Sequence, residues 1–280
     1  MPQMQMRRAA VVLATLTLTA TLYGAPPANK KRILVIGQTK GFEHDSVPDA
    51  MGSVWKMGHD TGLWDTYLRT DTELLTKGKV GPNGKNLDDF NLIVFASTTG
   101  ELELGEQQKK DILTFVHDEG KGFVGIHAAL DTNYKWPEYG EMIGAWFDNH
   151  PWNTFWAPII NEDRNSPITG HLPGGFVKRD EIYQPSKEFA RDKVHVLLRL
   201  DENKLDYTNN PRVKRADHDF AVAWTKMYGK GRVFYSTLGH TNESWNDPDV
   251  YRMYFEAIKW ALGLSEADTT SHPRTAAASH

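Results

Sequence analysis

The chain of 280 residues carries a formal net charge of −4 at pH 7 and contains no cysteine. This length suits one large α/β domain, at roughly 100–200 residues per domain. The acidic balance argues against a nucleic acid or an anionic membrane as partner. Without cysteine the chain has no disulfide and no thiolate nucleophile, and a metal would need His, Asp or Glu ligands. Such ligands favour Zn²⁺ or Mn²⁺, and no motif indicates an organic cofactor.

Residues 1–25 have the pattern of a secretory signal peptide. Arg7 and Arg8 supply the positive start, and a stretch of apolar and small residues runs from Ala9 to Tyr23. That stretch is short for a membrane span. We therefore expect a soluble protein that is exported to the periplasm without insertion into the membrane. The sequence leaves the formation of a homo-oligomer open.

The mature domain is expected to span residues 32–264, and its first half alternates strands with helices. Unbroken apolar runs predict buried strands, and apolar residues at helical spacing predict helices. Ser46 is the expected N-cap of the first helix, and Gly120 ends the second. The predicted strands are 32–38, 63–69, 92–96 and the start of 122–129, and the second helix is 106–119.

The second half is less regular. Two glycines flank Lys230 between apolar runs, which predicts a hairpin. Asp247 is the expected N-cap of a last helix that ends at Leu262, and residues 265–280 form a polar tail that we expect to be disordered. The predicted elements are a helix at 137–146, strands at 153–160, 176–183 and 194–200, and the hairpin strands 220–228 and 231–237.

This order of elements predicts an α/β fold with a doubly wound, mostly parallel sheet and helices on both faces. In such sheets, ligands bind where the carboxyl ends of the strands open into loops. His127 follows an apolar run at one such end, and packing alone does not account for a polar residue there. His44 and His240 follow the first and the last predicted strands. His44 is either a substrate contact or base, or a capping or solvated histidine, and His127 and His240 are either functional or satisfied structural histidines.

Two further candidates lie in the less regular half. Pro151 holds His150 extended, so the imidazole could face a metal or substrate, or could lie in an ordinary turn. Glu181 and Tyr183 share one face of a predicted strand. Glu181 is a metal ligand or acid–base group if that face lines the pocket, and a solvated residue if it does not. Aromatic side chains at the site could stack on sugar rings, although packing is their commoner role. The candidate substrate-binding residues are Trp146, Asp148, Trp152, Tyr183 and Trp224.

Five segments also resemble a known family, the ThuA-like proteins named for trehalose utilisation. They are GFEHDS, GFVGIHAALD, EMIGAWFDNHP, SPITGHLPGGFVKRDEIY and AVAWTKMYGKGRVFYSTLGH, and the likeness covers roughly residues 32–264. The resemblance implies a flavodoxin-like, class I glutamine amidotransferase-like fold and a role in carbohydrate metabolism. The resemblance also implies that members of the family often accompany oxidoreductases that make 3-keto sugars. It implies a bound divalent metal for some members. True amidotransferases carry a cysteine near the position of His127, so this chain is not a glutamine amidotransferase.

Two functions remain open from the sequence. The first is an exported hydrolase, lyase or isomerase that acts on a glycoside or 3-keto sugar. In that enzyme His44, His127, Glu181 and His240 would be catalytic, and His127, His150, Glu181 and His240 would hold the metal. The second is a non-catalytic carbohydrate-binding protein that keeps the fold. The number of histidines at strand ends favours the enzyme.

Overall fold

The computed structural model describes residues 30–82 and 84–274. The expected signal peptide, residues 1–25, lies outside the described residues. The helices are α1 (Val47–Thr61), α2 (Glu106–Leu113), α3 (Pro137–Ile143), α4 (Asn242–Asn246) and α5 (Pro248–Ala261). The strands are β1 (Lys31–Ile36), β2 (Trp64–Arg69), β3 (Leu92–Ala96), β4 (Gly122–Ile126), β5 (Phe147–Asn149), β6 (Thr154–Asn161), β7 (Gly175–Glu181), β8 (Gln184–Pro185), β9 (His195–Leu200), β10 (Ala221–Tyr228) and β11 (Gly231–Ser236).

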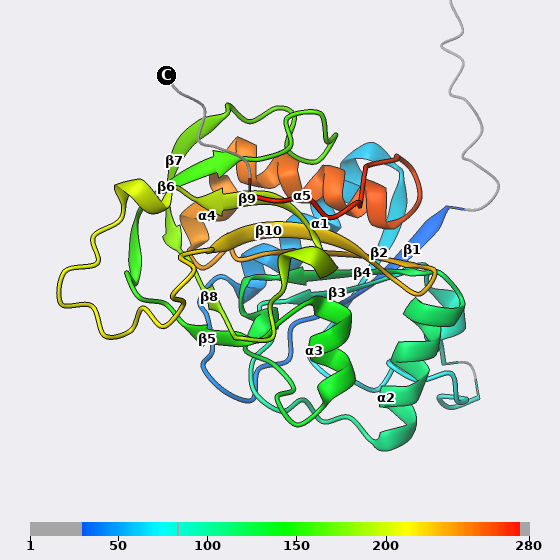
Figure 1. Cartoon of the computed structure of the whole chain (residues 1–280). Coiled ribbons are helices and arrows are strands. Elements are labelled where there is room, and N and C mark those ends of the chain that lie inside the picture. Colours follow the sequence, from blue (N-terminus) through cyan, green and yellow to red (C-terminus); the bar gives the residue numbers. More distant parts are fainter. Residues whose placement is uncertain (1–29, 83, 275–280) are drawn as a thin grey trace, which may run out of the picture.

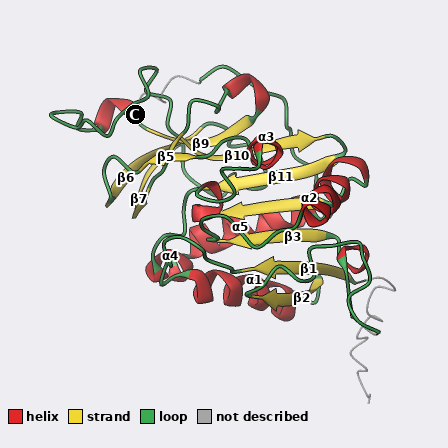
Figure 2. Ribbon diagram, turned by 90° about the horizontal axis from the view of Figure 1, so that it is seen from below, coloured by secondary structure: helices red, strands yellow, loops and turns green. Residues whose placement is uncertain are grey.

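Nine strands form one sheet in the order β2-β1-β3-β4-β11-β10-β9-β6-β7, and β5 pairs with β8 separately (Figure 2). The five strands from β2 to β11 run parallel. From β11 onward each pair is antiparallel, including the predicted hairpin of β10 and β11. The antiparallel strands extend the parallel core sideways, so that β7 forms the far edge.

Helices cover both faces of the sheet, as predicted. Helices α1, α4 and α5 lie on one face, and α2 and α3 on the other (Figure 1). Successive residues of β1 enter opposite cores: Val35 packs in the α1 and α5 layer, and Leu34 packs in the α2 and α3 layer. Burial on both faces explains the unbroken apolar runs. No helix in the described part is long and apolar enough to cross a membrane.

One of the two predicted N-caps forms its capping hydrogen bond, and the other makes a different contact. Asp247 caps α5, and its side chain accepts a hydrogen bond from the Asp249 backbone N–H. Ser46 occupies the N-cap position of α1, but its side chain makes no capping bond. Its hydroxyl donates instead to the Gly239 carbonyl, 2.9 Å away, on the loop that follows β11. The serine therefore joins two loops at the carboxyl edge of the sheet.

The described part of the predicted disordered tail, residues 265–274, packs against the sheet. The carbonyl of Thr270 accepts from Nδ1 of His195 at 2.6 Å, and Nε2 of His272 donates to the Val196 carbonyl at 3.0 Å. Both partners belong to β9. The polar composition of the segment concealed this contact, because the bonds join it to backbone and imidazole groups instead of an apolar core.

Ending the chain after Leu264 should lower the free energy of unfolding by about 2–3 kcal/mol, because several hydrogen bonds at about 1 kcal/mol each are lost. Ending it after Arg274 keeps all of those contacts and is the matched control. Urea unfolding of both variants measures the difference. Equal stability of the two truncated chains would contradict the structural role of the segment.

Candidate functional site

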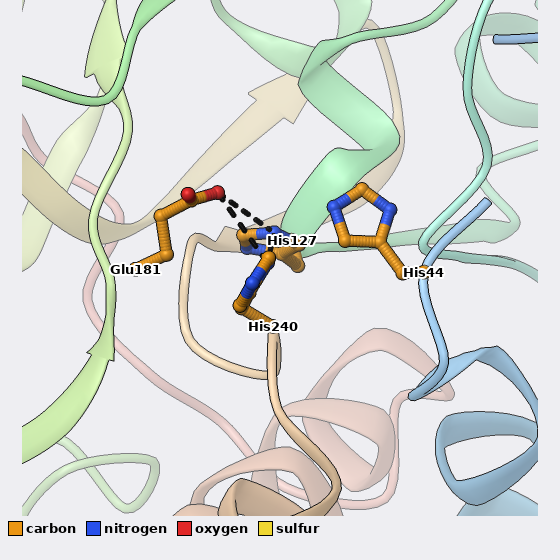
Figure 3. A group of neighbouring side chains, drawn as sticks. All are labelled: His44, His127, Glu181 and His240. Atoms are coloured by element: carbon orange, nitrogen blue, oxygen red, sulfur yellow. Dashed lines mark hydrogen bonds and ion pairs between the residues drawn. The ribbon is translucent and has the colours of Figure 1, made fainter. Parts of the chain in front are cut away.

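Four side chains from four separate segments converge at the carboxyl edge of the parallel strands. His44 lies in the loop after β1, His127 follows β4 directly, His240 follows β11, and Glu181 ends β7. Figure 3 shows them facing one another. One ligand atom of each lies within 4.8 Å of the others, and all but His240 are buried. The sequence predicted these four residues as the catalytic group, and the fold brings them together.

His127 is fixed by the turn that ends β4. Its φ of +44° is rare for a residue with a side chain, and such strain often marks functional positions. Nδ1 of the fully buried ring donates to the Thr237 carbonyl at 2.6 Å. That bond leaves Nε2 with a free lone pair, which points at Nδ1 of His240, 3.1 Å away.

The carboxylate of Glu181 completes this side of the group. Its Oε2 lies 3.3 Å from Nδ1 of His240 and 3.7 Å from Nε2 of His127. The His44 ring approaches from the opposite side, with its centroid 4.8 Å from that of His127 and 5.1 Å from that of His240. The four groups thus surround one point from different directions.

Burial keeps the three imidazoles neutral. It lowers the pKa of His44 to about 4, with further lowering from nearby His240 and His150. Burial is also the main cause that lowers the pKa of His127 and of His240. Burial raises the pKa of Glu181, and the proximity of His150 opposes that effect. Neutral imidazoles with free lone pairs are the form that binds metal ions.

The donor set fits a divalent metal ion. At Zn–N distances of about 2.0–2.1 Å, the ligand atoms of a tetrahedral site lie about 3.3–3.4 Å from one another. The atom pairs among His127, His240 and Glu181 are separated by 3.1, 3.3 and 3.7 Å. Three imidazoles and one carboxylate suit Zn²⁺ and other borderline ions, including Mn²⁺. His127, His240, Glu181 and His44 would be its ligands.

Asp180 holds the two ligand-bearing segments together. Its fully buried carboxylate accepts hydrogen bonds from the backbone N–H groups of Gly239 (2.8 Å) and His240 (3.1 Å). It also accepts from the hydroxyl of Ser244 and the N–H of Glu181, each at 2.8 Å. Burial raises the pKa of Asp180 to about 6, although these four bonds favour the charged form. Gly239 turns with φ of +115°, which few other residues adopt.

His150 lies beside this group and is not among its clustered donor atoms, so its role as a metal ligand stays a prediction. Its Nδ1 is 3.4 Å from the other carboxylate oxygen of Glu181 and 3.1 Å from Oδ1 of Asn153. The side chain is 35% exposed, so it connects the buried group with solvent. The fourth potential ligand within the group is His44.

The predicted substrate-binding residues are dispersed. Tyr183 lies beyond the end of β7, and its ring centroid is 4.4 Å from that of His127. The Asp148 carboxylate bonds Gln184 at 2.6 Å and Lys214 at 2.8 Å. Trp146 stacks on Tyr134, with centroids 6.5 Å apart.

Two of the predicted tryptophans have structural partners. Trp224 is fully buried, and its indole N–H donates to the Ile143 carbonyl at 2.9 Å. It is a core residue with no face for a sugar ring, which corrects that prediction. Trp152 is half-buried, packs on Phe155 and Phe220, and donates to the Asp206 carbonyl.

The sequence analysis missed Asp180, although one signal was available. Side chains alternate along a strand, so Asp180 must face away from Glu181, toward the core. A carboxylate on a core-facing position requires hydrogen-bond donors, and a glycine-containing loop after a parallel strand supplies backbone N–H groups.

Comparison with known proteins identifies relatives by sequence and by fold. The ThuA family model, described as trehalose utilisation, matches residues 32–261. A ThuA-like protein from Bacteroides uniformis is 20% identical with a TM-score of 0.66, over 86% of this chain and 95% of that one. A ThuA-like protein from Parabacteroides merdae is 16% identical with a TM-score of 0.62, over 86% and 97%. These likenesses confirm the predicted fold. No curated protein matches the chain.

The metal-free protein should lose stability as the pH falls from 6.5 towards 4. The unfolded chain takes up protons on His44 near its ordinary pKa of 6.5, whereas the folded chain does so only near 4, so acid favours unfolding across this window. Urea unfolding at pH 7 and pH 4.5 measures the loss, which should be smaller in H44Q. H59Q removes an exposed histidine of α1 and should keep the wild-type loss. An equal loss in H44Q and wild type would refute this assignment.

Asp180→Asn should lower the free energy of unfolding by about 1–3 kcal/mol, because an amide NH₂ would face groups that donate to the carboxylate. Ser244→Ala removes one of the four bonds and should cost about 1 kcal/mol. Thermal and urea unfolding of both variants give the comparison. If Asp180→Asn is as stable as the wild type, the carboxylate does not hold the loop.

Proposed function

Because the chain belongs to the ThuA family, described as trehalose utilisation, we propose that it is an exported enzyme that acts on a glycoside or 3-keto sugar. Its reaction is acid–base chemistry assisted by a divalent metal ion, Zn²⁺ or Mn²⁺, and leads to hydrolysis, elimination or isomerisation. The observation that carries this proposal is the convergence of His44, His127, Glu181 and His240 within 4.8 Å. Few structural roles account for three neutral imidazoles and a carboxylate in one buried group.

Each side chain has a role that follows from its surroundings. His44, His127, Glu181 and His240 hold the ion, which when bound would polarise a substrate oxygen and make a neighbouring C–H or a water more acidic. His127 is oriented by the Thr237 carbonyl, and His240 by its loop bonds to Asp180. These partners fix the ligand geometry before anything binds.

His150 is the proposed proton carrier. It is partly exposed, and its Nδ1 lies between Oε1 of Glu181 and Oδ1 of Asn153. Both oxygens accept hydrogen bonds, so Nδ1 carries a proton, and Nε2 is the atom that accepts a proton from the substrate and exchanges it with solvent. A ketone in the substrate would acidify the neighbouring C–H, which brings its removal within reach of a histidine base.

The purified protein should contain close to one divalent ion per chain by elemental analysis. Metal-depleted protein should gain about 2.7 kcal/mol of stability at an ion concentration 100 times the dissociation constant. His127→Ala and Glu181→Gln remove a ligand and should lose the ion, whereas His59→Ala, on the exposed face of α1, should keep it. A depleted protein whose melting temperature does not respond to Zn²⁺, Mn²⁺ or Ni²⁺ would exclude the metal site.

The catalytic proposal is tested by incubating native and 3-oxidised disaccharides with the protein, with and without metal. Consumption that requires metal and falls by at least about 100-fold in His150→Ala, the loss typical of a missing general base, is the expected result. Tight sugar binding without turnover would instead identify a carbohydrate-binding protein. Retained folding of His150→Ala by circular dichroism is the control.

A further inference from the structure

Trp156 on β6 is 70% exposed, the highest value among the exposed large apolar side chains of the described residues. Tryptophan is highly buried on average, so packing does not explain such exposure. Phe42, on the loop that carries His44, is 66% exposed. The Phe42 ring lies beside the site, with its centroid 4.8 Å from that of His44.

The strand register puts Trp156 close to Glu181, one of the four candidate metal ligands. Thr154 pairs with Glu181, and Trp156 pairs with Arg179, in the antiparallel ladder of β6 and β7. Residues two apart on a strand share a face and lie roughly 7 Å from each other. Trp156 and Arg179 therefore lie one step along the same face from Thr154 and Glu181.

A cavity of about 470 Å³ lies at the candidate site, and Trp156 lines a second cavity of about 330 Å³. The walls of the larger cavity include His44 and His240 at the buried group, Thr154 and Arg179 on the strand face, and Phe42. Ligand-binding pockets commonly measure about 300–1,000 Å³. The two cavities share Arg179 and Glu243 as lining residues, so Trp156 lies beside the cavity of the candidate metal ligands.

Negative charges exceed positive charges in the larger cavity, even when a divalent ion and its ligand Glu181 are counted. Glu43, Asp45 and Glu243 line it, against the single guanidinium of Arg179. Carboxylates accept hydrogen bonds from hydroxyl groups, and a guanidinium donates to hydroxyl oxygens. The lining therefore suits an uncharged polyol and repels a phosphorylated sugar.

We propose that Trp156 and Arg179 form a second sugar subsite, and that the substrate class is a neutral glycoside of at least two rings. One ring reacts at the group around His127, and the apolar C–H face of the next ring packs on the Trp156 indole. This inference rests on the proposed carbohydrate function and specifies its substrate.

The test measures binding of trehalose, maltose, cellobiose, glucose and trehalose 6-phosphate to the full chain by calorimetry. At least one neutral disaccharide should bind more tightly than glucose and than the phosphorylated sugar. Trp156→Ala should weaken that disaccharide about tenfold and leave glucose unchanged. Trp55→Ala is the matched control, because Trp55 is an exposed tryptophan of α1 that stacks on His59.

Three results would overturn the subsite: no disaccharide that binds more tightly than glucose, tighter binding of the phosphorylated sugar, or unchanged disaccharide affinity in Trp156→Ala. A change in sedimentation of Trp156→Ala without a change in sugar affinity would assign Trp156 to a contact between copies of the chain, and also overturns it.

Metal content is measured in the same samples. A protein that binds disaccharides through Trp156 but holds no metal and turns nothing over would refute the enzyme proposal and leave the subsite intact.

Discussion

The buried carboxylate of Asp180 is the constraint on which the site depends. Glu181 and His240 come from strands that are not neighbours in the sheet, since β10, β9 and β6 separate β11 from β7. Asp180 spans this gap by accepting from the backbone of Gly239 and His240 while its own strand positions Glu181. A buried carboxylate is costly unless several donors satisfy it, and here four donors do so. Its desolvation cost is thereby offset by bonds that also fix the spacing of two candidate ligands.

Hydrogen bonds between loops also fix the rest of the site at the carboxyl edge of the sheet. Parallel strands deliver their loops to one edge, and two hydrogen bonds then join those loops. Ser46 ties the loop of His44 to Gly239, and the Thr237 carbonyl orients the ring of His127. The strained turn at His127 is tolerated because β4, buried between β3 and β11, holds its position. The site is therefore built by the backbone of the loops as much as by its four side chains.

Local sequence patterns were enough to predict the parallel strands and the histidines at their carboxyl ends. Unbroken apolar runs identified β1, β3 and β4, and their parallel arrangement put His44 and His127 at one edge. Sequence could not give the sheet order beyond β10, because antiparallel strands joined by long loops have no local signature. It also could not separate Trp224, a core residue, from Trp156, which is exposed, since both lie in apolar strands. The polar composition of residues 265–274 also gave no indication that they pack on the sheet, because this packing depends on hydrogen bonds to backbone carbonyls.

The electrostatics of the group give a physical reason to expect a cation. Three buried imidazoles that lie this close together cannot all be charged, and burial lowers the pKa of each. Their lone pairs are then concentrated around one point, where they repel one another. The Nε2 of His127 and Nδ1 of His240, 3.1 Å apart, either share one proton or accept a common partner. A divalent ion would satisfy these lone pairs and the Glu181 carboxylate at once, whereas a single proton satisfies one pair of atoms and leaves the buried Nδ1 of His44 without a hydrogen-bond partner.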